Sequence, residues 1–173
     1  MNFTTADLCD EFESLVKIAK PLFQDYGQLK SYYGEIATVK VFEDNMLVRK
    51  TLETEGRKRI LVVDGGASMK VALVGDQLGQ IAYDSGWTGI VVNGCIRDSA
   101  EIAKIPIGLK ALNTVPKKSI KKGLGKVDVP VEFAGLVFNP GDYLYADLDG
   151  VIVSEKNLLK SPARRSRTGK RET

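Results

Sequence analysis

Three charged side chains at a fixed spacing are the first candidates for chemistry. Asp76 is followed, after twenty intervening residues, by the pair Arg97-Asp98. A carboxylate such as that of Asp98 is a hard oxygen ligand that suits Mg²⁺ or Mn²⁺. A guanidinium such as that of Arg97 binds a carboxylate through a planar fork of donors. Asp76 can hold a water molecule or orient Arg97. The alternative is that Asp76 caps a helix and Arg97-Asp98 is a solvated turn, because both features are common in proteins.

The elements around these residues predict that they meet. Residues 60–63 and 89–92 are apolar runs that end in turn residues, which is typical of strands buried on both faces. Residues 75–85 between them show a helical apolar pattern with an acidic first turn and a glycine stop. A strand, a helix and a strand make a βαβ unit with parallel strands. Ligands of such sheets bind at the carboxyl ends of the strands.

The start of the predicted helix adds main-chain donors to this site. The first N–H groups of a helix have no partner within the helix and favour an anion. They can therefore bind the carboxylate or phosphate of a ligand. The residues that carry them are Gly75, Asp76, Gln77 and Leu78.

Composition limits the class of protein. The 173 residues are 43% hydrophobic and 27% charged, which predicts one globular domain over residues 1–159. No apolar run approaches the roughly 18 residues that a membrane helix needs. The acidic start lacks the apolar region of a secretory signal, so we expect a cytoplasmic protein. Cys9 and Cys95 are expected to be reduced and buried, the alternative being a disulfide between them.

The absence of histidine narrows the chemistry. Ser-His-Asp and Cys-His catalysis are excluded, and two cysteines cannot complete a zinc site of the Cys/His type. Any metal must be bound by oxygen, which favours Mg²⁺, Mn²⁺ or Ca²⁺. Acid–base steps must then use carboxylates, lysine, tyrosine or metal-bound water.

Two segments are rich in Lys and Arg, and the sequence allows two roles for each. The tail, residues 160–173, has six Lys/Arg and one Glu, so its charge is +5 and that of the remaining chain is −2, since the total is +3. We predict that this tail is disordered. We expect it only to add solubility, and therefore expect no direct nucleic-acid site; the alternative is that its basic run contacts RNA or an acidic partner. Residues 117–126 form a basic, glycine-containing loop. This loop is either a solvated hairpin or a means of drawing anionic substrates toward a cleft.

The other patterns complete an α/β fold. Helices are predicted at 4–15, 46–55 and 99–103, and residues 18–22 and 23–33 are predicted to be extended and loop-like, respectively. Strands are predicted at 35–42, 105–107, 109–112, 127–133 (an edge strand, because of Pro130), 136–138 and in a hairpin over 143–154. The predicted architecture is a layered β/β/α sandwich, similar to a swivelling domain, with a central βαβ unit and a β-rich C-terminal half.

Several motifs, in order, resemble one known family. They are ADLCDEF, KPLF, VKVFEDN, ILVVDGG, GDQLGQIAYDSGWTGIVVNGCIRD, KALNTVPKKS and VDVPVEFAGLVFNPGDYLYADLDGVIVS, which together span residues 3–158. The chain is similar to the family named for regulator of ribonuclease activity A, which also contains the class II 4-hydroxy-4-methyl-2-oxoglutarate aldolases. A methyltransferase label has been attached to such sequences. We find no glycine motif here for binding the nucleotide of a methyl donor.

The resemblance implies roles for the charged residues. Aldolase members share an Asp, twenty residues and then Arg-Asp, and this chain keeps that pattern, although Glu101 also matches regulator-type members. By resemblance, Asp98 binds Mg²⁺ or Mn²⁺, partly through waters. The backbone of residues 75–78 and Arg97 bind the carboxylate of a 2-oxo acid, and Asp76 positions a water. No lysine lies between residues 75 and 98, which disfavours Schiff-base chemistry.

Two functions follow from this resemblance. The first is metal-dependent cleavage of 4-hydroxy-4-methyl-2-oxoglutarate to pyruvate, with oxaloacetate decarboxylation through the same pyruvate enolate. The second is a non-catalytic regulator that binds an endoribonuclease or RNA helicase and inhibits RNA turnover. Members of the family form homotrimers, some paired into hexamers, so a closed ring is expected.

Overall fold

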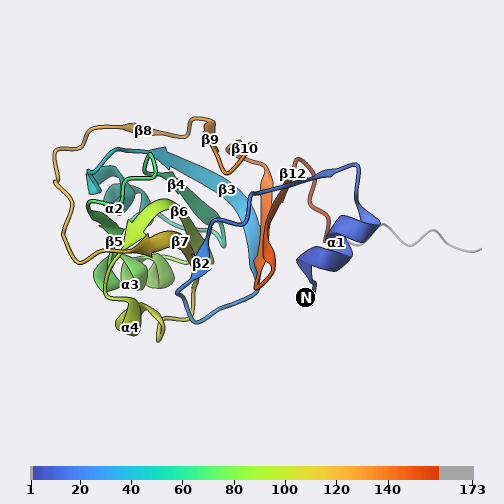
Figure 1. Ribbon diagram of the computed structural model, residues 1–173, viewed down its shortest axis with the longest axis horizontal. Coiled ribbons are helices and arrows are strands. Elements are labelled where there is room, and N and C mark those ends of the chain that lie inside the picture. The colour runs from blue at the N-terminus through green and yellow to red at the C-terminus, as the bar shows by residue number, and fades with distance from the viewer. Residues whose placement is uncertain (1, 160–173) are drawn as a thin grey trace, which may run out of the picture.

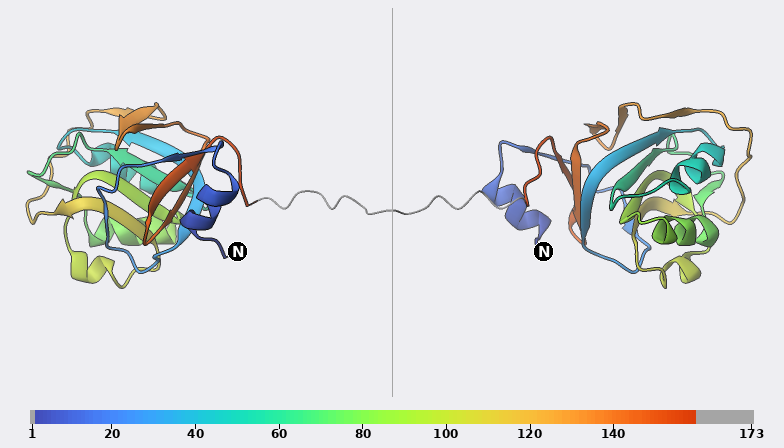
Figure 2. Two further views of the ribbon diagram at one scale, coloured as in Figure 1. Left: turned by 45° about the vertical axis from the view of Figure 1, so that its right-hand side comes forward. Right: turned by 180° about the vertical axis from the view of Figure 1, so that it is seen from behind.

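One large sheet runs through the molecule, and helices α2, α3 and α4 cover one side of it (Figures 1 and 2). The computed structural model describes residues 2–159. In spatial order the main path of the sheet is β1 (Val16–Ile18), β12 (Gly150–Ser154), β11 (Tyr143–Asp147), β3 (Tyr32–Lys40), β4 (Ile60–Asp64), β6 (Gly89–Ile96), β7 (Gly108–Thr114) and β2 (Gln24–Asp25).

The remaining elements attach to this path. β5 (Ala72–Val74) pairs with β6, β8 (Lys126–Val127) pairs with β3, and β9 (Val131–Phe133) and β10 (Leu136–Phe138) form a separate antiparallel pair. The helices are α1 (Thr5–Glu11), α2 (Met46–Leu52), α3 (Asp76–Asp84) and α4 (Ser99–Ile102).

The central strands are buried on both faces, as their apolar runs predicted. In β4, Leu61 and Val63 belong to a core shared with α2, α3 and α4, whereas Ile60 and Val62 belong to a second core shared with β9 to β12. This division follows from the two-residue period of a strand. A helical layer, the central strands and a second β layer therefore stack in that order. The predicted β/β/α sandwich with a β-rich C-terminal half is confirmed.

The predicted βαβ unit is present, but it contains one more strand. β4 and β6 are parallel neighbours, with Ile60 opposite Gly89. Between β4 and α3 the chain forms β5, which the sequence analysis missed, and β5 pairs in parallel with the last part of β6. The first half of β6 thus lies beside β4 and its end lies beside β5. The strand that leads directly into α3 is β5.

Several predicted boundaries were wrong. The first helix ends at Glu11 rather than near residue 15, because the chain turns so that Val16 can pair with Ser154. Strands β1 and β2 lie where extended chain and loop were predicted, and β3 begins at Tyr32. Helix α2 ends at Leu52 rather than at residue 55.

Strand predictions in the second half were also partly wrong. Of the two strand pieces predicted between residues 105 and 112, the first, 105–107, is not a strand, and the second, 109–112, lies within β7, which begins at Gly108. The strand predicted over 127–133 is split into β8 and β9, because Asp128 has a positive φ of 55° and leaves the extended conformation. The hairpin of β11 and β12 is confirmed. No helix within residues 2–159 is long and apolar enough to cross a membrane. The predicted disordered tail lies outside the described residues.

Candidate functional site

Parallel pairing of β5 and β6 places the two halves of the candidate site side by side. Ala72 lies opposite Cys95 and Val74 opposite Ile96, so the two strands end at the same level. The next residues, Gly75 and Arg97, therefore become neighbours. The N–H of Arg97 donates to the carbonyl of Val74 at 3.0 Å, which continues the pairing beyond the strands.

Gly75 is in direct contact with the Arg97-Asp98 pair. A Cβ atom built on Gly75 would lie 2.7 Å from Oδ2 of Asp98 and 3.6 Å from Nε of Arg97. The φ of Gly75 is −120°, which any residue can adopt, so space rather than backbone conformation favours glycine here. The same Oδ2 accepts a hydrogen bond from the N–H of Asp76 at 3.1 Å. The missing side chain is what lets the Asp98 carboxylate reach the start of α3.

Asp98 has an unusual backbone conformation. Its φ and ψ are 57° and 40°, in the left-handed region, and it immediately precedes α4. A non-glycine residue in this region is uncommon, although aspartate tolerates it better than most residues. The side chain is exposed, as the turn interpretation predicted, yet it turns back toward α3 rather than into solvent.

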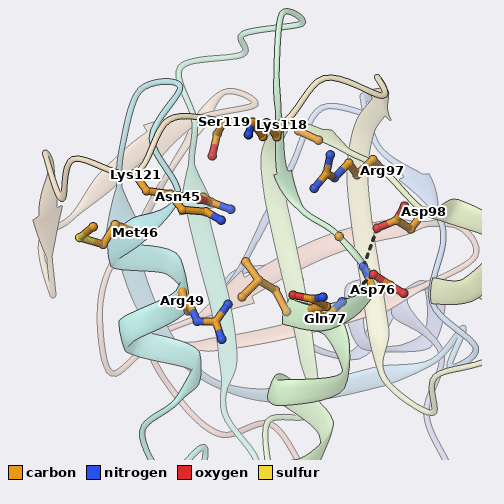
Figure 3. Close-up of a pocket in the computed structure, with 13 residues that line it drawn as sticks. Asn45, Met46, Arg49, Asp76, Gln77, Arg97, Asp98, Lys118, Ser119 and Lys121 are labelled. Carbon is orange, nitrogen blue, oxygen red and sulfur yellow. Dashed lines mark hydrogen bonds between the residues drawn. The ribbon is translucent and has the colours of Figure 1, made fainter.

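One cavity of about 210 Å³ brings together all six residues predicted for the site (Figure 3). Gly75, Asp76, Gln77, Leu78, Arg97 and Asp98 all line it. Arg97 lies at its edge, where Nη1 donates to the carbonyl of Pro116 at 3.5 Å. Arg97 and Asp98 also line an adjoining cavity of about 250 Å³.

Two of the main-chain N–H groups predicted to bind a ligand at the helix start already donate hydrogen bonds within the chain. The N–H of Asp76 is bound by Asp98, and the N–H of Gln77 donates to Oδ1 of its neighbour Asp76 at 2.9 Å. The carbonyl of Val74, to which Leu78 would donate in a longer helix, already accepts from Arg97. The N–H of Leu78 thus remains the donor best placed for a ligand, together with the guanidinium of Arg97.

The cavity also contains residues that the sequence analysis did not assign to a site. They come from the start of α2 and from the basic loop: Asn45, Met46, Arg49, Ala72, Lys118, Ser119 and Lys121. The loop is not a hairpin, so that interpretation was wrong. Its residues Lys118 and Ile120 instead make isolated parallel bridges to Ala72 and Asp44, respectively. The other interpretation, a loop that attracts anions to a cleft, agrees with this geometry.

Asp44 fixes the loop to α2. This side chain is fully buried and accepts hydrogen bonds from the N–H groups of Met46, Lys122 and Leu124 at 3.0–3.1 Å. Burial raises the pKa of Asp44, but the backbone donors of Met46, Leu124, Gly123 and Lys122 outweigh it and lower the pKa below its usual value. The charged form of Asp44 therefore holds two walls of the cavity together.

The charge of the cavity favours an anionic ligand. Four cationic side chains line it (Arg49, Arg97, Lys118 and Lys121), against two acidic ones, Asp76 and Asp98. A wall with excess positive charge raises the local concentration of anions. A volume of about 210 Å³ is small compared with the 300–1,000 Å³ that is typical of drug-sized pockets. Both properties suit a short organic acid.

The donor set fits a weakly held divalent cation. Oδ2 of Asp98 is engaged by Asp76, and its Oδ1 accepts no hydrogen bond from any residue in 2–159. Within the same residues, no group of three or more His, Cys, Asp or Glu side chains could hold a metal. Mg²⁺ is commonly bound by one or two carboxylates, with water and substrate completing the octahedron. Asp98 can therefore hold such an ion only together with water and an oxygen-bearing ligand.

Known proteins similar to this chain carry at least three kinds of name, one of which is that of an aldolase. A protein of Dechloromonas aromatica named "Putative 4-hydroxy-4-methyl-2-oxoglutarate aldolase" is 55% identical over 162 residues, covering 91% of this chain and 99% of that protein. A protein of Azotobacter vinelandii with the same name is 49% identical over 158 residues, covering 91% of this chain and 98% of its own.

Solved structures have the same fold. The RNA-processing inhibitor RraA from Thermus thermophilus is 42% identical, with a TM-score of 0.88 over 93% of this chain and 99% of that one. A Geobacillus kaustophilus structure named as an S-adenosylmethionine: 2-dimethylmenaquinone methyltransferase is 51% identical, with a TM-score of 0.91 over 93% and 100% of the two chains. The family described as RraA-like, Aldolase/RraA, matches residues 5–153. The chain therefore belongs to the RraA-like family, as its motifs predicted.

Proposed function

We propose that this protein is a divalent-metal-dependent aldolase that cleaves 4-hydroxy-4-methyl-2-oxoglutarate to pyruvate. One observation carries the proposal: Gly75 lets Asp98 and Arg97 close onto the start of α3, within a single cationic cavity. Relatives named for this activity at about half identity support it.

The binding step uses Arg97 and the helix start. In this proposal the Arg97 guanidinium and the N–H of Leu78 bind the carboxylate next to the 2-oxo group. Positioning of this kind can supply much of a rate enhancement, because it removes the need to orient the reacting bond. A divalent ion held by Asp98 would supply positive charge for the developing enolate oxygen, an effect worth several kcal/mol.

The cleavage step moves one proton and breaks one bond. The bond between C3 and C4 breaks, and its electron pair forms the enolate of pyruvate. The proton of the 4-hydroxyl leaves to a water molecule that Asp76 positions, and the C4 fragment becomes a second pyruvate. Protonation of the enolate at C3 completes the reaction. Loss of CO₂ from oxaloacetate gives the same enolate, so we propose oxaloacetate decarboxylase activity as well.

A coupled pyruvate assay tests this proposal. Pyruvate release would be measured with 4-hydroxy-4-methyl-2-oxoglutarate and with oxaloacetate, before and after chelation of metal and after restoring Mg²⁺ or Mn²⁺. The proposal expects release that chelation abolishes and added metal restores. Full release after chelation would count against the metal.

A second function, regulation of RNA turnover, is supported by the Thermus relative named as an RNA-processing inhibitor. In that case the chain, as a homotrimer, would bind an endoribonuclease or RNA helicase. A pull-down in which the unmodified chain and the Asp98→Ala variant bind such an enzyme equally well would favour this function, provided that the chain has no lyase activity. The two functions can coexist, because function depends on sites rather than on the fold.

A further inference from the structure

We propose that Arg49 binds a second carboxylate of the substrate and so makes the site selective for dicarboxylic 2-oxo acids. The inference rests on the proposed function in one respect: Arg97 is taken to bind the first carboxylate. It concerns a residue of α2 that no pattern in the sequence connects with the Asp76, Arg97 and Asp98 constellation.

Helix α2 presents Arg49 to the cavity because of its amphipathic pattern. Val48 and Leu52 are fully buried in the core beneath the helix, so Arg49 lies on the side that leads out toward solvent. It lines the cavity together with Asn45 and Met46 of the same segment. Figure 3 shows Arg49 on the wall opposite Arg97 and Asp98, with its guanidinium directed toward the middle of the cavity.

Glu53 orients the Arg49 side chain. Nε of Arg49 donates to Oε1 of Glu53, one turn later on the same helix, at 2.7 Å. The two terminal nitrogens of this guanidinium make no hydrogen bond with any residue in 2–159. An arginine held at Nε by one carboxylate retains the pair of terminal N–H donors that can bind another carboxylate end-on.

The same strand supports both walls of the cavity. Nδ2 of Asn45, at the start of α2, donates to the carbonyl of Leu73 in β5 at 3.2 Å. The next residue of β5, Val74, accepts from the N–H of Arg97 on the other wall. The helix start that carries Arg49 and the main chain of Arg97 are therefore both fixed to β5. A preorganised pair of this kind discriminates between ligands by their length and by the presence of a second charge.

The balance of charge supports a dianion. The lining has two more cationic than acidic side chains, and an ion at Asp98 would add further positive charge. A ligand with one carboxylate, bound at Arg97, would leave the terminal nitrogens of Arg49 without an acceptor, because Glu53 binds only its Nε. A second carboxylate at the far end of a five-carbon chain would supply that acceptor.

Matched ligands that cannot be cleaved test the inference directly. 2-Oxoglutarate and 2-oxopentanoate have the same five-carbon chain and differ only in the carboxylate at C5. Binding of each would be measured by calorimetry with Mg²⁺ present, for the unmodified chain, Arg49→Met and Lys50→Met. Lys50 is an exposed neighbour on the same helix that does not line the cavity, so it controls for a general loss of positive charge.

We expect the unmodified chain and Lys50→Met to bind 2-oxoglutarate about ten-fold more tightly than 2-oxopentanoate, which is equivalent to ~1.4 kcal/mol. Arg49→Met should bind both ligands with the weaker affinity. Glu53→Gln, which removes the charge that orients Arg49, should reduce the discrimination partially. Equal binding of the two ligands by the unmodified chain, or discrimination that survives Arg49→Met, would overturn the inference.

The outcome is separable from that of the proposed function. If discrimination depends on Arg49 but no pyruvate is released from 4-hydroxy-4-methyl-2-oxoglutarate, the dicarboxylate site stands and the aldolase proposal fails. If pyruvate is released and the Arg49→Met variant keeps its preference for 2-oxoglutarate, the aldolase proposal stands and the role of Arg49 fails.

Discussion

Replacing Gly75 with alanine should impair metal-dependent activity while leaving the fold intact. The new Cβ atom would lie 2.7 Å from Oδ2 of Asp98. Because real Cβ contacts are essentially never shorter than 3.0 Å, one of the two groups must move by at least 0.3 Å, the difference between these distances. Asp98 is exposed and lies at the end of a flexible side chain, so the carboxylate should move rather than the backbone.

The expected effects on stability and on activity therefore differ in size. The φ and ψ of Gly75, −120° and −170°, are open to alanine, so the change in the free energy of unfolding should stay within about 0.5 kcal/mol. Displacement of Asp98 breaks its hydrogen bond to the N–H of Asp76 and shifts the proposed metal ligand. Misplacement by about 1 Å can cost about 100-fold in rate, so we expect kcat/KM to fall by between ~10- and ~100-fold.

The assay is pyruvate release from 4-hydroxy-4-methyl-2-oxoglutarate, titrated with Mg²⁺. Gly75→Ala should need more Mg²⁺ for half-maximal activity. Gly79→Ala is the matched control, since the three atoms nearest to its Cβ would belong to the side chains of Ile105, Ile102 and Ile107, the nearest at 3.0 Å. If Gly75→Ala were folded and kept both its kcat/KM and its Mg²⁺ requirement, the contact between Gly75 and Asp98 would have no functional role.

Three further predictions follow from the same structure. Arg97→Met should raise the KM for the 2-oxo acid about 100-fold in steady-state assays, because the substrate carboxylate loses its counter-charge; an unchanged KM would exclude Arg97 as the carboxylate-binding group. Because the pKa of Asp44 is lowered in the folded state, its stabilising effect should be present above about pH 4 and lost as the pH falls through the folded pKa. The difference in Tm between the unmodified chain and Asp44→Ala should then be larger at pH 6 than at pH 3. An equal difference in Tm at both pH values would contradict this role of Asp44. Lys110→Met should lower the free energy of unfolding by about 2 kcal/mol, because it removes the buried ammonium that lies 3.0 Å from Oδ1 of Asp25 and leaves that carboxylate unpaired. The loss should not be larger, because Oδ1 of Asp25 makes no well-aligned hydrogen bond with the described residues. Chemical denaturation would measure the loss, and Lys110→Met combined with Asp25→Asn should recover part of it; no loss in the single variant would show that the pair is neutral.

Much of the site was predictable because its residues lie close together in sequence. The runs that became β4 and β6 are apolar on both faces, and a strand buried between two layers requires this pattern. Gly75, just before α3, and Asp76, its first residue, marked the helix start. Parallel strands end at the same edge, so the meeting of Gly75 with Arg97 and Asp98 could be expected from the sequence alone.

The strand that makes this contact could not be predicted. Ala72–Val74 is only three residues long, too short for a periodic signal, and it becomes a strand because it pairs with the end of β6. Local pattern carries no information about such a partner, which lies more than twenty residues away.

The second wall of the cavity was missed for a related reason. Arg49 and Lys118 lie on segments whose charges look like solvated surface, and nothing near them in sequence marks a site. Their position depends on buried Asp44, which bonds to main-chain groups 78 and 80 residues further along. Such a contact exists only once the chain has folded.

The most direct test of the account is a crystal structure of the protein with Mn²⁺ and pyruvate bound. Anomalous scattering locates the metal without reference to its ligands, and the pyruvate carboxylate reports the anion site. The account predicts Mn²⁺ beside Asp98, with the pyruvate carboxylate on Arg97 and the N–H of Leu78. Mn²⁺ remote from Asp98, or pyruvate bound outside the cavity that Gly75 and Arg97 share, would contradict it.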